Sequence, residues 1–472
     1  MTPPAKPGVD LRGKRVLVVG LARTGLATAL FCEARGASVT ATDTLGNSDL
    51  TGAAAKLSSA GVTLELGGHR RETFLGAELI VPSPGVPFDQ ADLVAARKKG
   101  VAVWSEIELA WRFLRGRLVA ITGSNGKTTT TALTGHILKS AGLPVLVGGN
   151  IGTPLISLVE ESREESIAVV EVSSFQLEAI VAFRPDISVY LNLTPDHIDR
   201  HGSMEGYAAA KARIFENQRG EDAAVMNADD AASARYAPSR PRVYWFSRKK
   251  EVARGAFVRG DDIIFCDGDA EARLASRAGI PLRGEHNLEN VLAAATAACL
   301  AGAAPAAIAE GVRTFPGVEH RLQFVAEIGG VQFYNDSKAT NVDATEKALE
   351  AFPGNLLVIL GGKDKGSDYR PLAPLLARTA RRAFLIGAAA EKIAAQIRGA
   401  IPLEMSGTLD RAVHAAYEAA RPGDVVLLAP ACASFDQFQN FEHRGRVFVE
   451  LVNELAESAA ARKTRDAAGG SR

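Results

Sequence analysis

The sequence predicts an α/β protein with three domains, each built on a mostly parallel sheet. Apolar runs of strand length alternate with longer helical stretches, which is typical of strand–helix–strand units. At 472 residues the chain is also too long for a single hydrophobic core. One boundary lies near Ser105, before an amphipathic stretch, and another lies in the turn-rich linker 314–321. We therefore expect domains at residues 1–106, 107–317 and 318–472.

The composition is that of an ordinary soluble globular protein, with 47% hydrophobic and 23% charged residues. Lys and Arg together number 54, as do Asp and Glu, so no net charge attracts nucleic acid or an anionic membrane. The four cysteines are Cys32, Cys266, Cys299 and Cys432. They form no C-x-x-C pair, which argues against a disulfide framework or a zinc site. No apolar run is long enough for a membrane span. We expect a cytoplasmic protein.

The N-terminal domain begins like a Rossmann-like nucleotide-binding domain. Residues 15–20 form an apolar strand, a loop and a helix follow, and residues 37–43 supply a second strand that ends in Asp43. The glycines are spaced G-x-x-x-x-G and lack the middle glycine that lets a pyrophosphate approach, so another nucleotide-like ligand is favoured over NAD. The loop 82–87 follows a strand where open α/β sheets bind ligands, and an ordinary proline-rich turn is the alternative.

The central domain is organised around a strand, a turn and a helix at residues 118–141. The turn and the helix start read Gly123-Ser124-Asn125-Gly126-Lys127-Thr128. Glycines let backbone N–H groups approach phosphate oxygens, Lys127 can reach the terminal phosphates, and the Thr128 hydroxyl can hold Mg²⁺. Ile121 stands where the full phosphate-binding motif has its first glycine. A simple strand–turn–helix corner with an exposed lysine is therefore the alternative.

Candidate metal ligands follow the phosphate loop. Glu171 lies in the apolar strand 167–172, where an ionised carboxylate is costly unless a cation or hydrogen-bond donors meet it. Beside a phosphate loop such an acid commonly serves Mg²⁺, and we favour that role over a structural pairing. The loop 194–201 carries two histidines and two aspartates after another strand. His197 can therefore ligate a metal or move a proton, or it can simply be solvated.

Lys211 lies on a helix expected at residues 204–217. It shares a helical stripe with Tyr207, Ile214 and Phe215. From the residues alone, the favoured interpretation is a lysine that packs its stem on this apolar face and keeps its ammonium in water.

A long Ala-rich helix is expected from residue 284 to Ala301, just before the linker. Asn287 or Asn290, near its start, can hydrogen-bond a base or a ribose. Capping of the helix is the alternative role for these side chains.

The third domain is expected to be another Rossmann-like α/β sheet. Its strands lie near residues 356–360, 383–386 and 425–428, with helices between them. Polar loops at the ends of its elements are candidate binding loops, namely 334–341, 361–365 and 430–436. Thr340 has the capping-box spacing to Asp343 and is expected to cap the helix that follows.

Taken together, these stretches resemble the Mur ligases of peptidoglycan synthesis, and the likeness covers all three domains. The stretches that carry it are 123–128, 149–152, 171–178, 196–200, 210–213, 320–321, 335–341 and 434–438. Asp-Ser-Lys-Ala-Thr-Asn at 336–341 is most specific to the member that adds D-glutamate. Gly-Lys-Thr-Thr at 126–129 is shared by the whole superfamily, folylpolyglutamate synthase included. The missing first glycine is usual in these ligases, so it no longer counts against nucleotide binding.

The resemblance implies a monomeric, ATP-dependent amide ligase that joins D-glutamate to UDP-N-acetylmuramoyl-L-alanine with two Mg²⁺ ions. The UDP-substrate would contact Leu21, Ala22, Arg23, Thr24, Ser83, Pro84, Gly85 and Asn150. ATP would contact Gly123, Ser124, Asn125, Gly126, Lys127, Thr128, Thr129, Asn290, Arg321 and Asp336. The metal ligands would be Thr128, Glu171, His197 and Lys211. Glutamate would contact Thr340, Lys365, Ser434 and Phe441.

The resemblance also changes the interpretation of Lys211. This residue matches the family's carbamylated lysine, whose new carboxylate helps to place a second Mg²⁺. An amine that loses its charge by carbamylation fits a partly apolar helix face.

The chemistry implied by the resemblance has two steps. The alanyl carboxylate attacks the γ-phosphorus of ATP, with Lys127 and the metals neutralising charge, and an acyl phosphate forms. The amine of glutamate then attacks the acyl carbon, and phosphate leaves. Whether His197 acts as a base or only as a metal ligand stays open, as does the preferred enantiomer of glutamate.

Other function classes fit these residues less well. A nicotinamide dehydrogenase would need NAD near Gly20, where the middle glycine is absent. A folylpolyglutamate-type ligase would lack a dedicated domain ahead of the phosphate loop. A non-catalytic scaffold would have no reason to keep the phosphate-loop lysine together with Glu171, His197 and Lys211.

Overall fold

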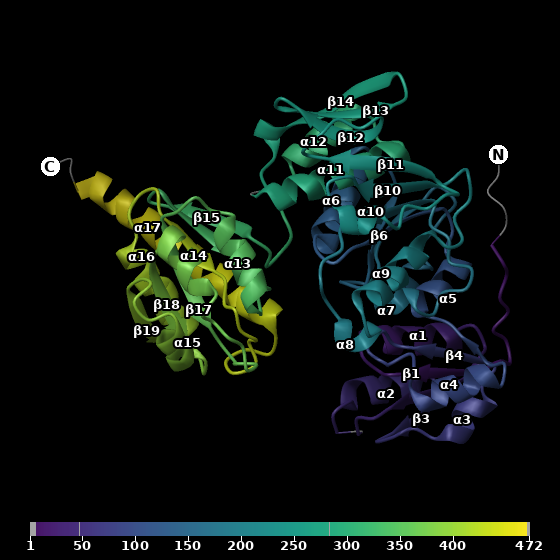
Figure 1. Cartoon of the computed structure of the whole chain (residues 1–472). Coiled ribbons are helices and arrows are strands. Elements are labelled where there is room, and N and C mark those ends of the chain that lie inside the picture. Colours follow the sequence, from purple (N-terminus) through teal and green to yellow (C-terminus); the bar gives the residue numbers. More distant parts are fainter. Residues whose placement is uncertain (1–5, 47, 283, 470–472) are drawn as a thin grey trace. The chain divides into compact units, whose positions relative to one another are not determined.

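The computed structural model describes residues 6–46, 48–282 and 284–469. Within these residues the strands form three sheets with helices packed on them, which confirms the expected α/β class (Figure 1). By compactness the chain divides into two units. The first comprises Met1–Ile280 and Glu289–Phe315, and the second comprises Pro281–Leu288 and Pro316–Arg472.

The N-terminal sheet has the strand order β3-β2-β1-β4-β5, and its strand pairs are parallel. Its elements are β1 (Arg15–Val19), α1 (Arg23–Glu33), β2 (Ser38–Asp43), α2 (Thr51–Ser59), β3 (Thr63–Leu66), α3 (Arg71–Gly76), β4 (Leu79–Pro82), α4 (Ala91–Lys98) and β5 (Ala102–Val103). Val16 and Val18 of β1 face the core that includes α1, whereas Leu17 and Val19 face the core that includes α3 and α4. The strand order reverses between β1 and β4, where open α/β sheets bind ligands.

The central sheet has the order β14-β13-β12-β11-β10-β9-β6-β8-β7. Its strands are β6 (Arg117–Thr122), β7 (Val145–Gly149), β8 (Ile167–Glu171), β9 (Ile187–Tyr190), β10 (Ala223–Asn227), β11 (Arg242–Ser247), β12 (Arg254–Arg259), β13 (Asp262–Asp267) and β14 (Ala270–Ser276). The pairs from β7 to β12 are parallel, and β12, β13 and β14 pair antiparallel. β6 therefore lies between β8 and β9, so the carboxyl ends of these three strands meet at the phosphate loop.

The helices of the central part of the chain are α5 (Glu106–Phe113), α6 (Lys127–Ser140), η1 (Leu155–Leu158), α7 (Ser174–Leu177), α8 (Ile198–His201), α9 (Met204–Ala212), η2 (Arg213–Phe215), α10 (Ala231–Ala234), η3 (Arg277–Gly279), α11 (Glu285–Ala301) and α12 (Pro305–Arg313). α6 packs on β7 and β8, and α12 packs on α6. All residues of β8 and β9 are buried, which explains their continuous apolar sequence.

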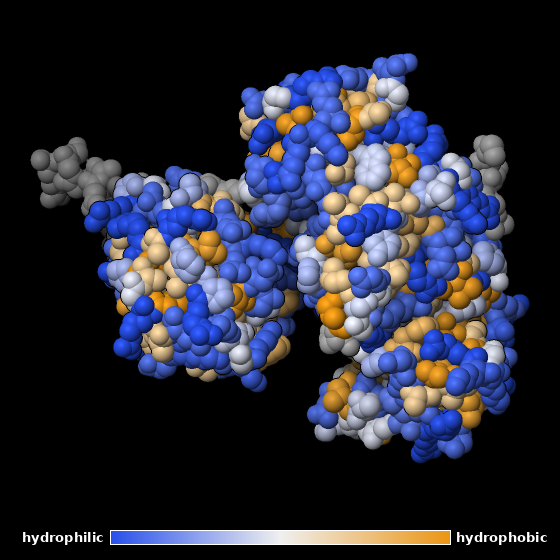
Figure 2. Space-filling model, viewed as in Figure 1, coloured by the Kyte–Doolittle hydropathy of each residue, from blue (hydrophilic) through white to orange (hydrophobic). Residues whose placement is uncertain are grey.

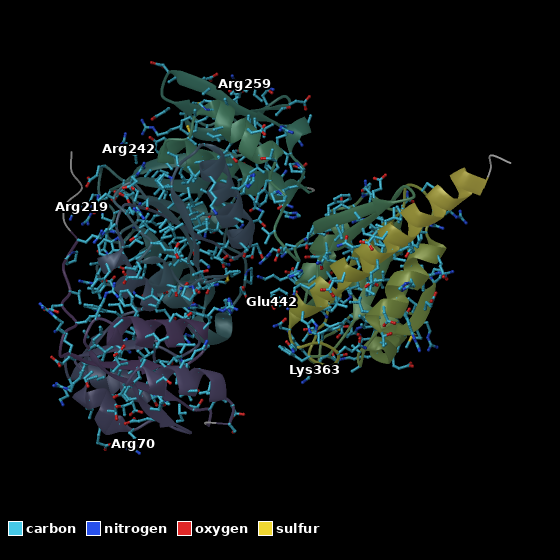
Figure 3. The ribbon with its side chains drawn as sticks, turned by 180° about the vertical axis from the view of Figure 1, so that it is seen from behind. Arg70, Arg219, Arg242, Arg259, Lys363 and Glu442 are labelled. Carbon is cyan, nitrogen blue, oxygen red and sulfur yellow. The ribbon has the colours of Figure 1, made fainter. Side chains whose placement is uncertain are left out.

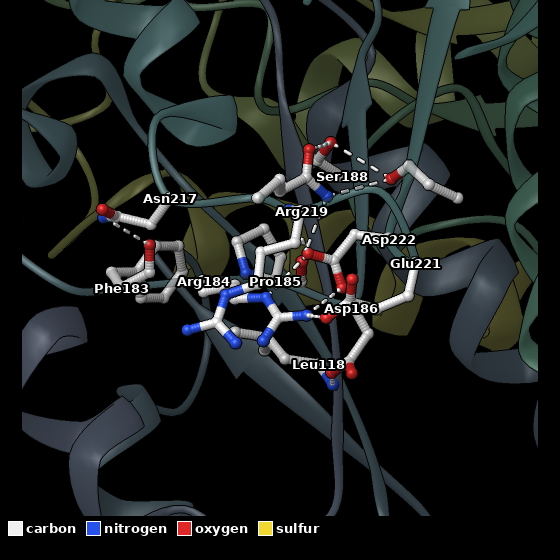
Figure 4. Close-up of polar contacts among 12 residues, drawn as sticks. Leu118, Phe183, Arg184, Pro185, Asp186, Ser188, Asn217, Arg219, Glu221 and Asp222 are labelled. Atoms are coloured by element: carbon white, nitrogen blue, oxygen red, sulfur yellow. Dashed lines mark hydrogen bonds and ion pairs between the residues drawn. The ribbon is translucent and has the colours of Figure 1, made fainter. Parts of the chain in front are cut away.

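Ion pairs hold the start of β9 (Figure 4). The Arg184 guanidinium donates to Asp222 at 2.7 Å and to Glu221 at 2.6 Å. Asp186, two residues further on, accepts from the backbone N–H of Leu118 at 2.7 Å and so ties β9 to β6. These contacts set the register of the strands that carry the phosphate loop.

The sheet of the second unit has the order β15-β16-β20-β17-β18-β19. Its elements are β15 (Gln323–Ile328), β16 (Val331–Asn335), α13 (Val342–Glu350), β17 (Leu356–Gly361), α14 (Leu372–Thr379), β18 (Ala380–Ile386), α15 (Ala390–Gln396), β19 (Leu403–Gly407), α16 (Leu409–Ala419), β20 (Val425–Leu428) and α17 (Phe441–Gly469). β15 and β16 are antiparallel and the other pairs are parallel. One core includes α13, α14 and α15, and the opposite core includes α16 and α17.

The predicted cap of α13 is wrong by one residue. The Asn341 side chain, and not that of Thr340, accepts the hydrogen bond from the backbone N–H of Ala344. A capping box at Thr340 would need Asp343 to accept from the Thr340 N–H, but that group donates to Lys338 O at 2.8 Å. Asp343 instead pairs with Lys347 at 2.6 Å.

The surface mixes polar and apolar groups. On the face drawn in Figure 2, small hydrophobic groups are interspersed among hydrophilic residues. Cationic and anionic side chains both project from the ribbon in Figure 3, for example Arg259 and Glu442. No helix within the described ranges combines the length and the apolar character needed to cross a bilayer.

Candidate active site

The phosphate loop follows β6 and leads directly into α6, as the sequence predicts. Gly123 has φ +155°, and a Cβ there would lie 2.9 Å from Leu191 Cβ. Gly126 has φ +83°, and a Cβ there would lie 2.2 Å from the Asn290 side-chain oxygen. Both positions therefore need glycine, because a side chain would be strained and would collide with a neighbouring residue.

Two lysines converge on this loop. Lys127 Nζ donates to Gly123 O and to Ser124 O, both at 2.9 Å. Lys211 Nζ, on α9, donates to the same Gly123 carbonyl at 2.7 Å. The sequence motif predicts the position of Lys127, whereas only the packing of α9 brings Lys211 to the phosphate loop.

The Lys211 side chain is buried, with 1% of the residue exposed. The interpretation from periodicity alone, a lysine that keeps its ammonium in water, is therefore wrong. Burial lowers the pKa of Lys211 well below its ordinary value, and the nearby charge of Lys127 lowers it further. The neutral amine, which is the reactive form, is thereby favoured.

Tyr207 links Lys211 to the histidine loop. Lys211 Nζ lies 4.5 Å from the centroid of the Tyr207 ring, and the ring centroid of His197 lies 6.1 Å from it. Ser124 Oγ donates to the Tyr207 hydroxyl at 3.3 Å. Periodicity predicts Tyr207 only as an apolar neighbour of Lys211, so its contact with the phosphate loop is a finding of the tertiary structure.

His197 is half exposed and has left-handed backbone, with φ 52°. Its Nε2 lies 3.5 Å from an Asp196 carboxylate oxygen, and its ring centroid lies 4.8 Å from that of Phe175. His201, by contrast, is inside the fold, where it contacts Ser174 at 3.0 Å and Glu178 at 3.4 Å. Of the two histidines in this loop, His197 is thus the one whose imidazole is accessible to a substrate.

Glu171 is 2% exposed at the end of β8. Its two carboxylate oxygens accept from Thr128 Oγ1 at 2.8 Å and from Asn150 Nδ2 at 3.1 Å. Sequence analysis expects a cation or hydrogen-bond donors to meet the buried Glu171 carboxylate. The donors are Thr128 and Asn150, which are themselves candidate site residues. A carboxylate and a hydroxyl are hard oxygen donors of the kind that Mg²⁺ prefers.

Among the described residues, no group of three or more His, Cys, Asp and Glu is arranged to hold a metal ion.

Asn290 reaches the phosphate loop from α11. Its side-chain oxygen accepts from Thr130 Oγ1 at 3.3 Å. Asn290 lies in the second turn of α11, so it does not cap this helix. Sequence analysis left a helix cap as the alternative, and the structure excludes that alternative for Asn290.

The two predicted loops of the N-terminal domain lie together at the β1–β4 switch point. Ser83 Oγ donates to Gly20 O at 2.7 Å, which joins the loop after β4 to the loop after β1. The Asp43 carboxylate accepts from the Leu21 N–H at 2.7 Å. Arg23 donates to Gly152 O at 2.9 Å and so contacts the loop that holds Asn150. Asp43 therefore supports the loop that a ligand would contact.

The second unit brings its three polar loops to one edge of the sheet, because β20 lies between β16 and β17. The Lys363 N–H donates to Ala433 O at 2.8 Å, which pairs the loop after β17 with the loop after β20. Ser337 Oγ donates to Phe441 O at 2.8 Å, which holds the start of α17. The loops that contain Thr340, Lys365, Ser434 and Phe441 are thus neighbours.

Asp336 is buried at the carboxyl end of β16. Burial raises its pKa to about 7, and the nearby Arg321 guanidinium opposes this shift. Its Oδ1 accepts from the Leu322 N–H at 3.3 Å. The structure therefore brings together the two residues of this unit that the resemblance assigns to ATP.

Arg444 is a residue that sequence analysis missed. It is fully buried, and among the described residues it donates to no carboxylate. Its guanidinium donates to Ser337 Oγ at 3.0 Å, to Ser337 O at 2.8 Å and to Cys432 O at 3.2 Å. Arg444 therefore joins two of the candidate binding loops. No local pattern in the sequence indicates that this arginine, near the start of a helix, is buried.

Family models match most of the chain. The Mur ligase MurD-like N-terminal domain matches residues 14–105, the Mur ligase middle domain matches 121–298, and the Mur ligase glutamate ligase domain matches 320–432.

Curated relatives match nearly the whole chain. The UDP-N-acetylmuramoylalanine--D-glutamate ligase of Acidobacterium capsulatum is 56% identical over 456 residues, which are 96% of this chain and 98% of the relative. The protein of the same name from Koribacter versatilis is 53% identical over 450 residues, which are 95% and 99% of the two chains.

Solved structures share the fold at low identity. The UDP-N-acetylmuramate-alanine ligase of Thermotoga maritima has a TM-score of 0.58 at 19% identity, covering 93% of this chain and 99% of its own. A pseudomurein peptide ligase from Methanothermus fervidus has a TM-score of 0.56 at 20% identity, covering 94% and 100%. These structures establish the fold, while the family models and the curated relatives establish kinship. The chain belongs to the Mur ligase family.

Proposed function

We propose that this chain is an ATP-dependent ligase that joins D-glutamate to UDP-N-acetylmuramoyl-L-alanine through an acyl phosphate, in peptidoglycan precursor synthesis. The names of the relatives at 56% and 53% identity support this substrate pair. The single structural observation that carries the chemistry is the convergence of Lys127 and Lys211 on one carbonyl of the phosphate loop.

The proposal divides the work among the expected domains. Residues 1–106 bind the UDP-substrate, using Leu21 to Thr24 and Ser83 to Gly85, which lie together at the switch point. Residues 107–317 bind the phosphates of ATP and Mg²⁺. Residues 318–472 bind glutamate through Thr340, Lys365, Ser434 and Phe441, and contribute Arg321 and Asp336 to the nucleotide.

Lys127 is the cation for the terminal phosphates. It folds back over the loop and contacts two backbone carbonyls at 2.9 Å. Phosphate oxygens would replace these acceptors, because an anion binds an ammonium more strongly than a neutral carbonyl does. The backbone N–H groups at the start of α6 add further donors for phosphate oxygens.

Thr128 and Glu171 would hold Mg²⁺, and they fit it because both offer hard oxygen atoms. When bound, Mg²⁺ neutralises charge on the phosphates during transfer. A carbamylated Lys211 would add a second carboxylate near the phosphate loop, and together with His197 it would serve a second ion. The buried, readily neutral amine of Lys211 supports this modification.

The residues of the chain orient the reactants. Lys127 offsets charge as the alanyl carboxylate attacks the γ-phosphorus, ADP leaves and the acyl phosphate forms. The deprotonated amine of glutamate then attacks the acyl carbon, and phosphate leaves as the amide forms. His197 has two candidate roles, general base for this amine and metal ligand, and its accessible imidazole suits both.

ADP formation tests the proposal. ADP and a new amide should appear only when ATP, UDP-N-acetylmuramoyl-L-alanine and glutamate are all present, with D-glutamate preferred over L-glutamate. Lys127→Ala should lower kcat by roughly 100-fold or more while the protein stays folded. Near-normal ligation by folded Lys127→Ala, or equal use of another amine, would exclude the assignment.

The cellular compartment and the oligomeric state are part of the proposal. ATP and UDP-linked sugars are cytoplasmic metabolites, so we propose that the chain works in the cytoplasm. We also propose that it acts as a monomer, since the residues assigned to each ligand come from one chain. Sedimentation at working concentration tests the monomer.

A further inference from the structure

The loop that carries Lys365 is held by contacts of Asp364 and Tyr369 that none of the assigned roles explains. Asp364 Oδ1 accepts from the N–H groups of Gly366 and Ser367 at 3.1 and 3.2 Å, which closes the turn around Lys365. The Tyr369 hydroxyl donates to the same oxygen at 2.8 Å. Tyr369 is fully buried, so the turn is fixed to the core of the unit.

The other carboxylate oxygen of Asp364 forms an ion pair with a lysine. Lys392 Nζ, from α15, donates to Asp364 Oδ2 at 2.8 Å. The two side chains are 37% and 29% exposed, so the pair is partly shielded from water. Lys392 and Tyr369 hold the pKa of Asp364 at about 2, so this carboxylate is ionised at neutral pH.

Lys365 follows Asp364 in the chain, and its ammonium group is not used by the Asp364–Lys392 pair. Its side chain is exposed, and it makes no hydrogen bond or ion pair with any residue that the structure describes. Lys363, on the other side of Asp364, also projects from the surface of this unit (Figure 3). An ionised aspartate between two exposed lysines would attract one of them if no other cation neutralised it.

We propose that Lys392 is a positioning residue of the amino-acid site: by neutralising Asp364, it leaves the Lys365 ammonium available to a carboxylate of glutamate. This inference rests on the proposed function, in which Lys365 binds glutamate. Lys392 itself does not touch the substrate in this scheme. It prevents a contact between neighbouring residues that would compete with substrate binding.

The inference is tested with variants that separate charge from structure. Lys392→Met removes the charge and keeps the length of the side chain. It should raise the KM for glutamate roughly threefold to tenfold, because Asp364 then competes for Lys365. The kcat and the KM for ATP should change little. Lys392→Arg keeps the charge and should retain the KM of the unmodified protein.

The decisive variant combines Lys392→Met with Asp364→Asn. The amide keeps an acceptor for the Tyr369 hydroxyl and has no charge to attract Lys365, so the double variant should bind glutamate better than Lys392→Met alone. A role limited to stability predicts the reverse, since each change removes further contacts. Lys347→Met is the matched control: it removes an exposed Lys–Asp pair, Lys347 with Asp343 at 2.6 Å, in the same unit.

Three results overturn the inference. The first is a glutamate KM for Lys392→Met equal to that of Lys347→Met. The second is a double variant that binds glutamate no better than Lys392→Met alone, and the third is loss of binding in Lys392→Arg. Lys365→Ala separates this failure from failure of the proposed function. If Lys365→Ala weakens glutamate binding and Lys392→Met does not, the inference alone is wrong. If Lys365→Ala has no effect, Lys365 is not part of the glutamate site and the proposed function needs revision.

Discussion

Lys211 illustrates how one residue changes meaning with its surroundings. On a helical wheel it is a cation on an apolar stripe, for which a solvated ammonium is the ordinary outcome. In the folded unit it is 1% exposed and shares a carbonyl acceptor with Lys127. Two ammonium groups so close together repel each other, and burial penalises charge. Both effects lower the pKa of Lys211, which makes the neutral amine more accessible than it is for a solvated lysine.

Lys211→Ala should be nearly inactive if a carboxylate at this position holds a metal ion. A short carboxylic acid in the medium should restore part of the activity, because it can occupy the vacated ligand position. Lys211→Arg should not be rescued, since its bulk and permanent charge fill the site. Ligation rates with and without the added acid provide the measurement. An active alanine variant, or equal rescue of the arginine variant, would contradict a carbamylated Lys211.

At the scale of elements, the candidate binding loops of the second unit are held by contacts with one another. The loops after β16, β17 and β20 lie side by side, and Arg444 of α17 donates to the first and the third. Burial lowers the pKa of Arg444 to about 10, which still leaves it charged at neutral pH. A buried guanidinium must be met by acceptors of good geometry, so it specifies how the loops are arranged.

Arg444→Met should destabilise the second unit by about 3 kcal/mol, because it leaves buried carbonyl groups without donors. The free energy of unfolding in urea, followed by circular dichroism, measures the loss. Arg382→Met, which removes an exposed guanidinium 3.3 Å from Glu404, is the control and should change stability by less than about 1 kcal/mol. Equal stability of the two variants would show that the contacts of Arg444 do not hold the loops.

At the scale of the whole molecule, the residues assigned to ATP belong to both compact units. Thr128 and Asn290 lie in the first unit, and Arg321 and Asp336 lie in the second. The linker between them contains Pro316 and Gly317, and the φ of Gly317 is +86°. A single ATP molecule can use both sets of residues only in some arrangements of the two units, so we expect ligand binding to select among these arrangements.

A non-hydrolysable ATP analogue together with the UDP-substrate should therefore change the small-angle scattering profile. The UDP-substrate alone should produce a smaller change, since its assigned residues lie in the first unit. Profiles that are the same with and without both ligands would show that ligand binding does not depend on movement of the units.

Much of the fold was predictable because it depends on local pattern. The apolar runs of β6 and β8, the turn at Gly123 to Gly126 and the amphipathic stretch of α5 each reflect preferences of neighbouring residues. The exact cap of α13 was not predictable in this way, because Thr340 and Asn341 both suit a cap; in the structure the Thr340 N–H donates to Lys338 O, and the Asn341 side chain caps the helix. Lys392 and Arg444 gave no signal, since their partners lie far away in the sequence.

The sequence by itself determined the α/β class, the phosphate loop and the motifs of the family, because these are properties of short stretches whose residues interact with one another or with a ligand. Only the tertiary structure decided which loops meet and which charges are buried. β20 enters the sheet between β16 and β17, and α9 carries Lys211 to the phosphate loop. Such arrangements depend on packing between distant segments, where the burial of apolar faces outweighs local preference.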